Sequence, residues 1–282
     1  MSNDKGPRSI EKEIRVLAPV EAVWKALTDA EELTRWFPLE ARVKPGEGGS
    51  MWMAWKTDWQ HETPIAAWEP NKRLKLIYVE PTPPAKPGEP EPPFKIPYQV
   101  AVEYTLESRG GETVLRLVHS GFAADASWDS QYDGTVSGWD FQLAGLKLYL
   151  ERHRGTPRRC IYCRVAIPHV SIEEAWGKLM SPAGLLQVEH PAPSQADARY
   201  AFTTAAGDRL EGVVHAWKPP KGFSATVTNL NDAWMRLHIE ELTLFNRRDV
   251  NFFMGTYAVP QERVAELQTR FDGLLHTLFA ET

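Results

Sequence analysis

Two stretches of this 282-residue chain share one pattern, IRVLAPVEAVWKAL at residues 14–27 and CRVAIPHVSIEEAWGKL at residues 163–179. Their first six residues align at an offset of 149, and after a three-residue insertion Trp24 aligns with Trp176 at an offset of 152. Each stretch predicts a strand that leads into a short helix. A repeat on this scale predicts two related copies of one structural unit.

The ends of the two copies repeat as well. Apolar residues recur there at intervals of three and four, which places them on one face of a helix. They are Val136, Trp139, Leu143, Leu146 and Leu150 in the first copy and Val264, Leu267, Phe271, Leu274 and Leu278 in the second. We therefore expect each copy to close with a long amphipathic helix. The boundary is expected near Gly155-Thr-Pro157, giving domains 1–155 and 156–282.

Between these landmarks, runs of β-branched and aromatic residues are separated by Gly, Pro and Asn, which predicts strands and turns. We expect strands near residues 10–17, 39–44, 50–57, 62–69, 72–80, 98–108 and 112–120 in the first copy. In the second we expect them near 160–167, 199–204, 208–217, 223–229, 234–245 and 250–258. Strands that are bounded by helices, rather than alternating with them, predict an α+β fold with antiparallel sheets.

The segment 81–97 holds eight of the 22 prolines. Proline cannot donate a hydrogen bond to a central strand ladder, so this segment is predicted to be a long loop between two strands. Because the segment also has PxxP spacing, the alternative is that it binds an SH3-like domain of a partner protein.

Composition and charge limit the class of function. The chain is 43% apolar and 24% charged with a net charge of -5, and basic residues do not exceed acidic ones in either half. No nucleic-acid partner is therefore expected. No signal segment and no run of about 18 apolar residues occurs, so we expect a cytoplasmic protein without membrane insertion. Eight of the eleven tryptophans precede residue 155, more aromatic mass than a core of that size needs.

Motifs for metal and nucleophilic chemistry are missing from the sequence. Cys160 and Cys163 are three apart on an expected strand, where they point to opposite faces, so neither a disulfide nor a zinc site is predicted. The eight histidines show no HxH or HExxH spacing, and there is no Gly-x-Ser-x-Gly elbow or phosphate loop. No metal and no cofactor are expected. The acidic pairs Glu31-Glu32, Glu173-Glu174 and Glu240-Glu241 are expected to be solvated.

Several features of the first copy together resemble one family. They are Ile14 to Pro38, the Gly46-Glu-Gly-Gly49 turn, Leu117-Val-His-Ser-Gly-Phe122, and Gly138-Trp139 with the leucine stripe that follows. These residues look like the SRPBCC or START-like superfamily, in the branch related to the C-terminal domain of the heat-shock-protein-90 ATPase activator (AHSA-type). The resemblance covers about residues 8–153 and is fainter in the second copy.

The resemblance implies two tandem helix-grip domains, in each of which a curved antiparallel sheet wraps around a long C-terminal helix. It also implies a cavity between helix and sheet in the first domain. It does not imply one function, because the superfamily includes lipid carriers, allergens and polyketide cyclases.

The expected site is the wall of that cavity, since small-molecule sites are mostly apolar with a few polar groups. In Met51-Trp-Met-Ala-Trp55, alternation sends Trp52 to one face and Met51, Met53 and Trp55 to the other. Trp176 aligns with Trp24, which indicates that both are packing residues of the shared scaffold. The cluster from Trp52 to Trp68, by contrast, shows no aromatic counterpart in the second copy. The predicted wall consists of Trp36, Phe37, Trp52, Trp68, Tyr78, Tyr104, His119, Phe122, Trp139 and Leu143. Simple core packing is the alternative for each. His61 and His119 are weak candidates for acid–base roles.

Three functions remain open at this level. The first is non-catalytic binding of a small hydrophobic molecule or lipid. The second is a polyketide cyclase or dehydratase that uses His119, His61 or a tyrosine in general acid–base catalysis. The third, implied by the family label alone, is a co-chaperone that activates an ATPase, or a stress-response regulator. We expect the first, without catalysis; the sequence does not indicate the ligand or the oligomeric state.

Overall fold

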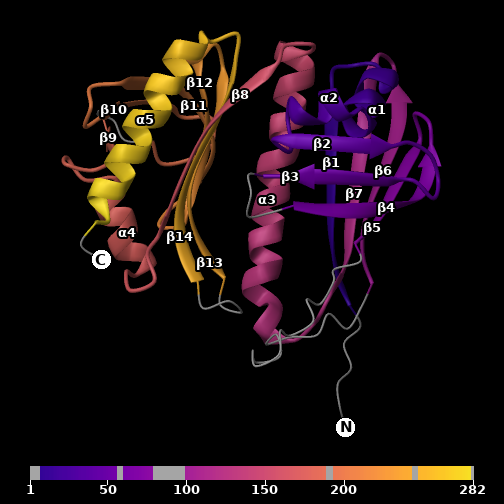
Figure 1. The fold of residues 1–282 in the computed structure, drawn as a ribbon, viewed down its shortest axis with the longest axis horizontal. Coiled ribbons are helices and arrows are strands. Elements are labelled where there is room, and N and C mark those ends of the chain that lie inside the picture. Colours follow the sequence, from indigo (N-terminus) through magenta and orange to yellow (C-terminus); the bar gives the residue numbers. More distant parts are fainter. Residues whose placement is uncertain (1–6, 56–59, 79–98, 189–192, 243–246, 281–282) are drawn as a thin grey trace. The chain divides into compact units, whose positions relative to one another are not determined.

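The computed structural model describes residues 7–55, 60–78, 99–188, 193–242 and 247–280. The chain divides into two compact units, Met1–Gly155 and Thr156–Thr282. In each unit a long helix lies against a seven-stranded antiparallel sheet (Figure 1). The segment 81–97, expected to be a loop, lies outside the described residues.

The first unit begins with strand β1 (Arg8–Val16) and the short helices α1 (Val20–Thr28) and α2 (Ala30–Thr34). Six further strands follow: β2 (Glu40–Lys44), β3 (Ser50–Ala54), β4 (Gln60–Glu69), β5 (Arg73–Tyr78), β6 (Val100–Arg109) and β7 (Glu112–Phe122). A 3-10 turn (Ala126–Trp128) leads into the long helix α3 (Asp129–Leu148), which ends in a π-helical turn (Tyr149–His153). The strand order in the sheet is β1-β7-β6-β5-β4-β3-β2.

The second unit repeats this plan. Its elements are β8 (Arg158–Ala166), α4 (Ile172–Leu179), β9 (Leu186–Val188), β10 (Arg199–Thr204), β11 (Arg209–Lys218), β12 (Gly222–Val227), a 3-10 turn (Thr228–Leu230), β13 (Ala233–Leu242), β14 (Arg247–Tyr257) and α5 (Gln261–Leu278). The strand order, β8-β14-β13-β12-β11-β10-β9, matches the first sheet position by position. The expected α+β fold with two tandem helix-grip units is therefore confirmed. The short strand β9 was not predicted, because three residues show no periodicity.

Local sequence explains where the short helices start. Asp29 caps α2, because its Oδ1 accepts a hydrogen bond from the Glu32 backbone N–H at 3.0 Å. In the second unit Ser171 caps α4 in the same way, its Oγ accepting from the Glu174 N–H at 3.1 Å. Such side chains satisfy amide groups that have no partner inside the helix. The helix that follows the first strand of each unit is thus positioned by the chain itself.

Glu32 is not solvated, contrary to the expectation for the Glu31-Glu32 pair. Its side chain is buried, with 7% of the residue exposed. The Tyr149 hydroxyl donates to Glu32 Oε2 at 2.5 Å, and Arg35 Nη1 donates to Oε1 at 2.6 Å. The Gly155 N–H donates to the same tyrosine oxygen at 3.1 Å. A buried carboxylate needs such partners, and here they join α2 to the end of α3.

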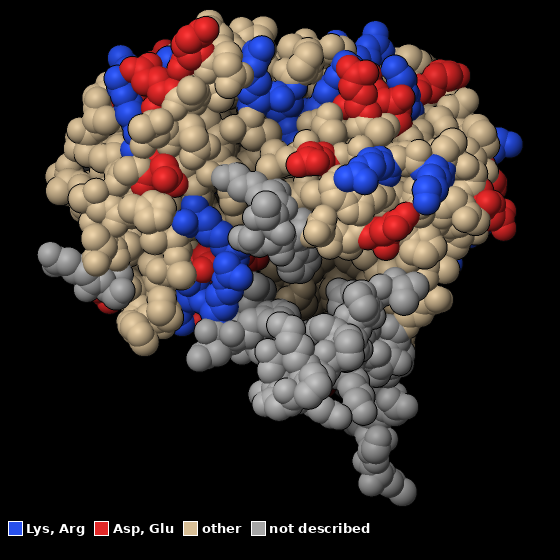
Figure 2. Space-filling view, in the orientation of Figure 1, with Lys and Arg blue, Asp and Glu red and all other residues tan. Residues whose placement is uncertain are grey.

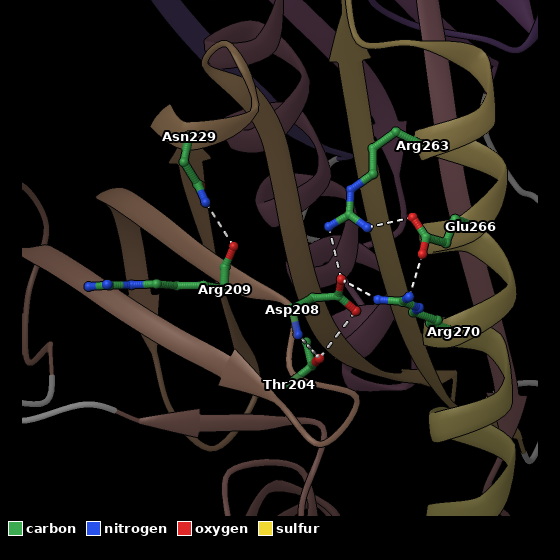
Figure 3. A network of polar contacts seen from close by, with 7 residues as sticks. All are labelled: Thr204, Asp208, Arg209, Asn229, Arg263, Glu266 and Arg270. Atoms are coloured by element: carbon green, nitrogen blue, oxygen red, sulfur yellow. Dashed lines mark hydrogen bonds and ion pairs between the residues drawn. The ribbon is translucent and has the colours of Figure 1, made fainter.

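A second buried carboxylate holds the long helix of the second unit. Asp208, between β10 and β11, is 4% exposed. Figure 3 shows its Oδ1 accepting hydrogen bonds from Arg263 at 2.9 Å and from Arg270 at 2.8 Å, both on α5. The Phe252 and Phe271 rings stack at a centroid distance of 4.2 Å and add an apolar contact between β14 and α5. Sheet and helix are therefore joined by a polar and an apolar contact.

Charged side chains of both signs are interspersed over most of the face in Figure 2. Cys163 is buried in the core of the second unit, and Cys160 is half-buried; neither forms a disulfide. No helix in the described ranges is long and apolar enough to span a bilayer. Within those ranges, no three His, Cys, Asp or Glu side chains are grouped as metal ligands. The absence of nucleic-acid and membrane partners remains a prediction.

Candidate functional site

Six aromatic side chains of the first unit form a closed circuit, which we call the ring cluster: Phe37, Trp55, His61, Tyr78, His119 and Trp139. Each ring contacts the next in this order, and Trp139 contacts Phe37 again. Centroid distances between successive rings run from 5.1 Å for Phe37–Trp55 to 6.0 Å for His119–Trp139. These are the spacings at which aromatic pairs attract.

The ring cluster draws on elements that are far apart in the sequence. Phe37 follows α2 and Trp55 follows β3, while His61, Tyr78, His119 and Trp139 lie on β4, β5, β7 and α3. Trp139 is 6% exposed, and the other five residues are half-buried. The helix and the inner face of the sheet thus present a set of aromatic surfaces that the described residues do not cover completely.

The pairing register explains why His61 and Trp55 share one face. His61 is paired with Met53 across β3 and β4, and paired residues in an antiparallel ladder point to the same side. Two residues further along, Trp55 lies on the side of Met53 and contacts His61 at a centroid distance of 5.5 Å. Trp55 was not among the predicted wall residues. Only the pairing register of β3 and β4 assigns Trp55 to this face, and the register cannot be read from the sequence.

His119 is held by a hydrogen bond to the long helix. Trp139 Nε1 donates to His119 Nδ1 at 2.9 Å. The imidazole also packs against Phe122 at 4.7 Å and stacks with Tyr78 at 6.0 Å. Burial lowers the pKa of His119 to about 4, because desolvation disfavours the charged form. At neutral pH the ring is therefore uncharged.

His61 is the second histidine of the ring cluster. It stands between Trp55 and Tyr78, and burial lowers its pKa below the usual value. Its Nε2 is buried and has no hydrogen-bond partner among the described residues. A buried polar atom without a partner costs about 1–3 kcal/mol. His61 thus adds to the ring cluster a polar atom that has no partner in the described part of the chain.

Gly121 gives the His-Ser-Gly-Phe segment its conformation. Its φ is +98°, and a Cβ at this position would lie 2.5 Å from the Gln99 carbonyl oxygen. Only glycine tolerates both conditions without strain. It allows β7 to pass close to the start of β6 while His119 and Phe122 remain packed against each other.

The other predicted wall residues fall into two groups. Trp36, Tyr104 and Phe122 are buried and each contacts a member of the ring cluster. Trp36 stacks on Phe37 at 5.0 Å and donates from Nε1 to the Ala26 carbonyl at 2.8 Å. Burial raises the pKa of Tyr104 well above its usual range, so its hydroxyl stays protonated. Leu143 is a buried core residue of α3.

Two predicted wall residues lie elsewhere. Trp52 is on the opposite face of β3 from Met53, where the Arg42 guanidinium lies over its ring at 4.2 Å. Trp68 follows a β-bulge in β4 and packs edge-to-face on Trp24 at 5.2 Å. The structure does not bring either of them into the ring cluster.

Trp68 also has a counterpart in the second unit, contrary to the sequence-based expectation. Trp217 follows the equivalent bulge in β11 and packs edge-to-face on Trp176 at 5.6 Å. The two tryptophan pairs occupy the same place in both units, between the first helix and the fourth strand. The Trp24–Trp68 contact is thus part of the shared scaffold.

Comparison with known proteins supports the fold. Residues 17–151 match the model of the family described as activator of Hsp90 ATPase homolog 1-like protein. No curated protein matches the chain. With the identical strand order of the second sheet, this match identifies an AHSA-type fold of the SRPBCC class, present as two tandem domains.

Similar solved structures include the Aha1 dimer from Colwellia psychrerythraea, at 20% identity over 52% of this chain and 99% of that one, with a TM-score of 0.43. Protein MLL2253 from Mesorhizobium loti is 26% identical over 52% of this chain and 98% of its own, with a TM-score of 0.41. The di-domain ARO/CYC BexL from the BE-7585A biosynthetic pathway is 15% identical over 98% of this chain and 99% of its own, with a TM-score of 0.43.

Proposed function

We propose that the first unit, with its AHSA-type fold, binds a small hydrophobic molecule at the ring cluster and performs no chemistry on it. The closed circuit of aromatic side chains carries this proposal. Five of its six members keep part of their surface exposed, although they lie between a helix and the inner face of a sheet, where side chains are normally covered. Covering apolar surface contributes about 25 cal/mol for each Å² removed from water.

The polar groups of the ring cluster favour binding over acid–base catalysis. A cyclase would need His119 or His61 to exchange a proton with its substrate near neutral pH. Burial lowers the pKa of both histidines, that of His119 to about 4, so the imidazolium form is scarce at pH 7. As a base, a ring of such low pKa is weak. Its nitrogens are better suited to orienting a ligand than to moving its protons.

A matched pair of variants tests the proposal. Trp55 and Trp52 are half-buried tryptophans on the same hairpin, but only Trp55 belongs to the ring cluster. Fluorene, a neutral planar hydrocarbon, is a suitable probe, and equilibrium dialysis measures its binding without depending on tryptophan fluorescence. We expect Trp55→Ala to weaken fluorene binding by about tenfold, since one lost aromatic contact is worth about 1 kcal/mol or more. Trp52→Ala should leave it within about twofold, a fraction of that energy.

Two outcomes would overturn the proposal. One is the absence of fluorene binding together with no co-purifying small molecule in native mass spectra of the full chain. The other is an equal loss of affinity in Trp55→Ala and Trp52→Ala, which would locate binding away from the ring cluster. The co-chaperone function predicts, by contrast, stimulation of a chaperone ATPase that Trp55→Ala leaves unchanged.

A further inference from the structure

The polar members of the ring cluster stand next to one another in the circuit. His61 contacts Tyr78, and Tyr78 contacts His119. The remaining members, Phe37, Trp55 and Trp139, complete the circuit on the other side. Trp139 directs its only N–H to His119, so the hydrogen-bonding group that this half still offers is the indole N–H of Trp55. A bound molecule would therefore meet one mostly apolar side, with the single indole N–H of Trp55, and one side that carries several nitrogen and oxygen atoms.

The hydrogen bond from Trp139 determines which nitrogen of His119 carries the proton. An indole N–H can only donate, and it donates to His119 Nδ1 at 2.9 Å. Nδ1 must then hold the lone pair. A neutral imidazole has one N–H, so in this ring the proton is on Nε2. The structure gives His119 no other hydrogen bond among the described residues, so this donor is not used by the protein there.

The neutral state of His119 is supported by its surroundings. The groups that face it are the rings of Tyr78, Phe122 and Trp139, and no ion pair in the described structure includes it. Burial without a compensating carboxylate lowers the pKa of the ring to about 4. The side chain is thus an uncharged donor near pH 7, comparable to an amide N–H.

We propose that Trp139 is a positioning residue that fixes His119 as an Nε2–H donor, and that the ligand is a neutral aromatic molecule with a carbonyl oxygen that accepts this hydrogen bond. This inference rests on the proposed function. A ligand whose only polar group is a donor would leave the Nε2–H unsatisfied. A carboxylate would lose its hydration beside a neutral ring, with no cation in the ring cluster to compensate.

The test compares two probes of nearly the same shape, 9-fluorenone and fluorene, which differ by a carbonyl in place of a methylene group. Equilibrium dialysis with the full chain should show about tenfold tighter binding of fluorenone, the effect of one satisfied buried donor. In His119→Phe the ring is retained and the donor is lost, so the two probes should bind alike. His61→Phe is the matched control and should keep the preference for fluorenone.

Trp139→Phe separates positioning from packing. Without the indole N–H, His119 can carry its proton on either nitrogen, so the preference for fluorenone should fall while fluorene binding changes less. Long-range ¹H–¹⁵N NMR spectra of His119 give a readout that packing alone would not move. They should show an Nε2–H tautomer in the unchanged chain and a mixture of tautomers in Trp139→Phe.

The outcomes distinguish a failure of the His119 inference from a failure of the proposed function. Equal binding of both probes by the unchanged chain overturns the inference and leaves the proposed function standing. A preference that persists in His119→Phe, or disappears in His61→Phe, assigns the donor to another group and also overturns it. An Nδ1–H tautomer in the unchanged chain does the same. If neither probe binds, the proposed function fails for neutral aromatic ligands and the inference fails with it.

Discussion

Acidification is expected to destabilise the first unit through His119. Burial lowers the pKa of this residue from 6.5 to about 4, so between these values the unfolded chain binds a proton that the folded chain does not. Stability therefore rises with pH in this interval, by about 1.4 kcal/mol per pH unit for one such group. Above the interval His119 is neutral in both states and adds no pH dependence. Below it the loss is complete, at about 3 kcal/mol.

Urea unfolding at two pH values measures this effect. From about pH 7.5 to about pH 5, His119 should cost about 2 kcal/mol of stability. Tryptophan fluorescence reports mainly on the first unit, because eight of the eleven tryptophans lie before residue 155. His119→Phe removes the titrating group and keeps an aromatic ring, so its free energy of unfolding should fall by about 2 kcal/mol less over the same interval. The lost Trp139 hydrogen bond lowers the stability of the variant at both pH values alike.

Two results would refute this reasoning. The first is an equal acid-induced loss of stability in the unchanged chain and in His119→Phe. The second is an NMR titration of the His119 ring with a midpoint near 6.5, its ordinary value, which would mean that the ring is hydrated. His61, whose pKa burial also lowers, is present in both chains, so its titration cancels in the comparison.

Three further changes test the scaffold around the site. Gly121→Ala forces a side chain into a backbone contact of 2.5 Å at a positive φ, so urea unfolding should show a loss of at least about 1–2 kcal/mol. Tyr149→Phe removes the hydroxyl that donates to the buried Glu32 carboxylate, and thermal unfolding should report a loss of about 1.5–3 kcal/mol, whereas an unchanged Tm would mean that water replaces the hydroxyl. Asp208→Asn removes the negative charge between two arginines of α5. Unfolding followed by circular dichroism should then show that the second unit is less stable by about 1.5–3 kcal/mol. Ligand binding in the first unit should not change.

The fold could be predicted because its signals are local and occur twice. The strand-to-helix pattern at Ile14 and Cys163 gave the start of each unit, and the apolar stripes through Leu146 and Leu274 gave the closing helices. The carboxylate of Glu32 was assigned to solvent because its charge suggested exposure. The partner that buries it, Tyr149, is 117 residues away, and no local pattern connects the two.

The candidate site could be predicted only in part, because it depends on register. Alternation correctly separated Trp52 from Met53 and Trp55 on β3, but it could not tell which face meets the long helix. The pairing of Met53 with His61 decides this. The bulge before Trp68 turns that ring to the same face as His61, but at the other end of β4, where it packs on Trp24. A shift of one residue exchanges the two faces of a strand, so the list of wall residues required the register as well as the periodicity.

The second unit provides an internal comparison for the proposed site. Its strands pair in the same register as those of the first, with Val214 opposite Ala225 where Ile65 is opposite Leu76. Carried along the sheet and the long helices, this equivalence aligns four members of the ring cluster, His61, Tyr78, His119 and Trp139, with Leu210, Val227, Met254 and Leu267. Those four residues are at most 1% exposed. Where the second unit closes its core with non-aromatic side chains, the first unit carries aromatic ones and leaves three of these four half-buried. The same fold can therefore be completed without this surface, so stability alone does not require the ring cluster. We accordingly expect fluorene to bind one equivalent per chain, and a second equivalent that survives Trp55→Ala would contradict this comparison.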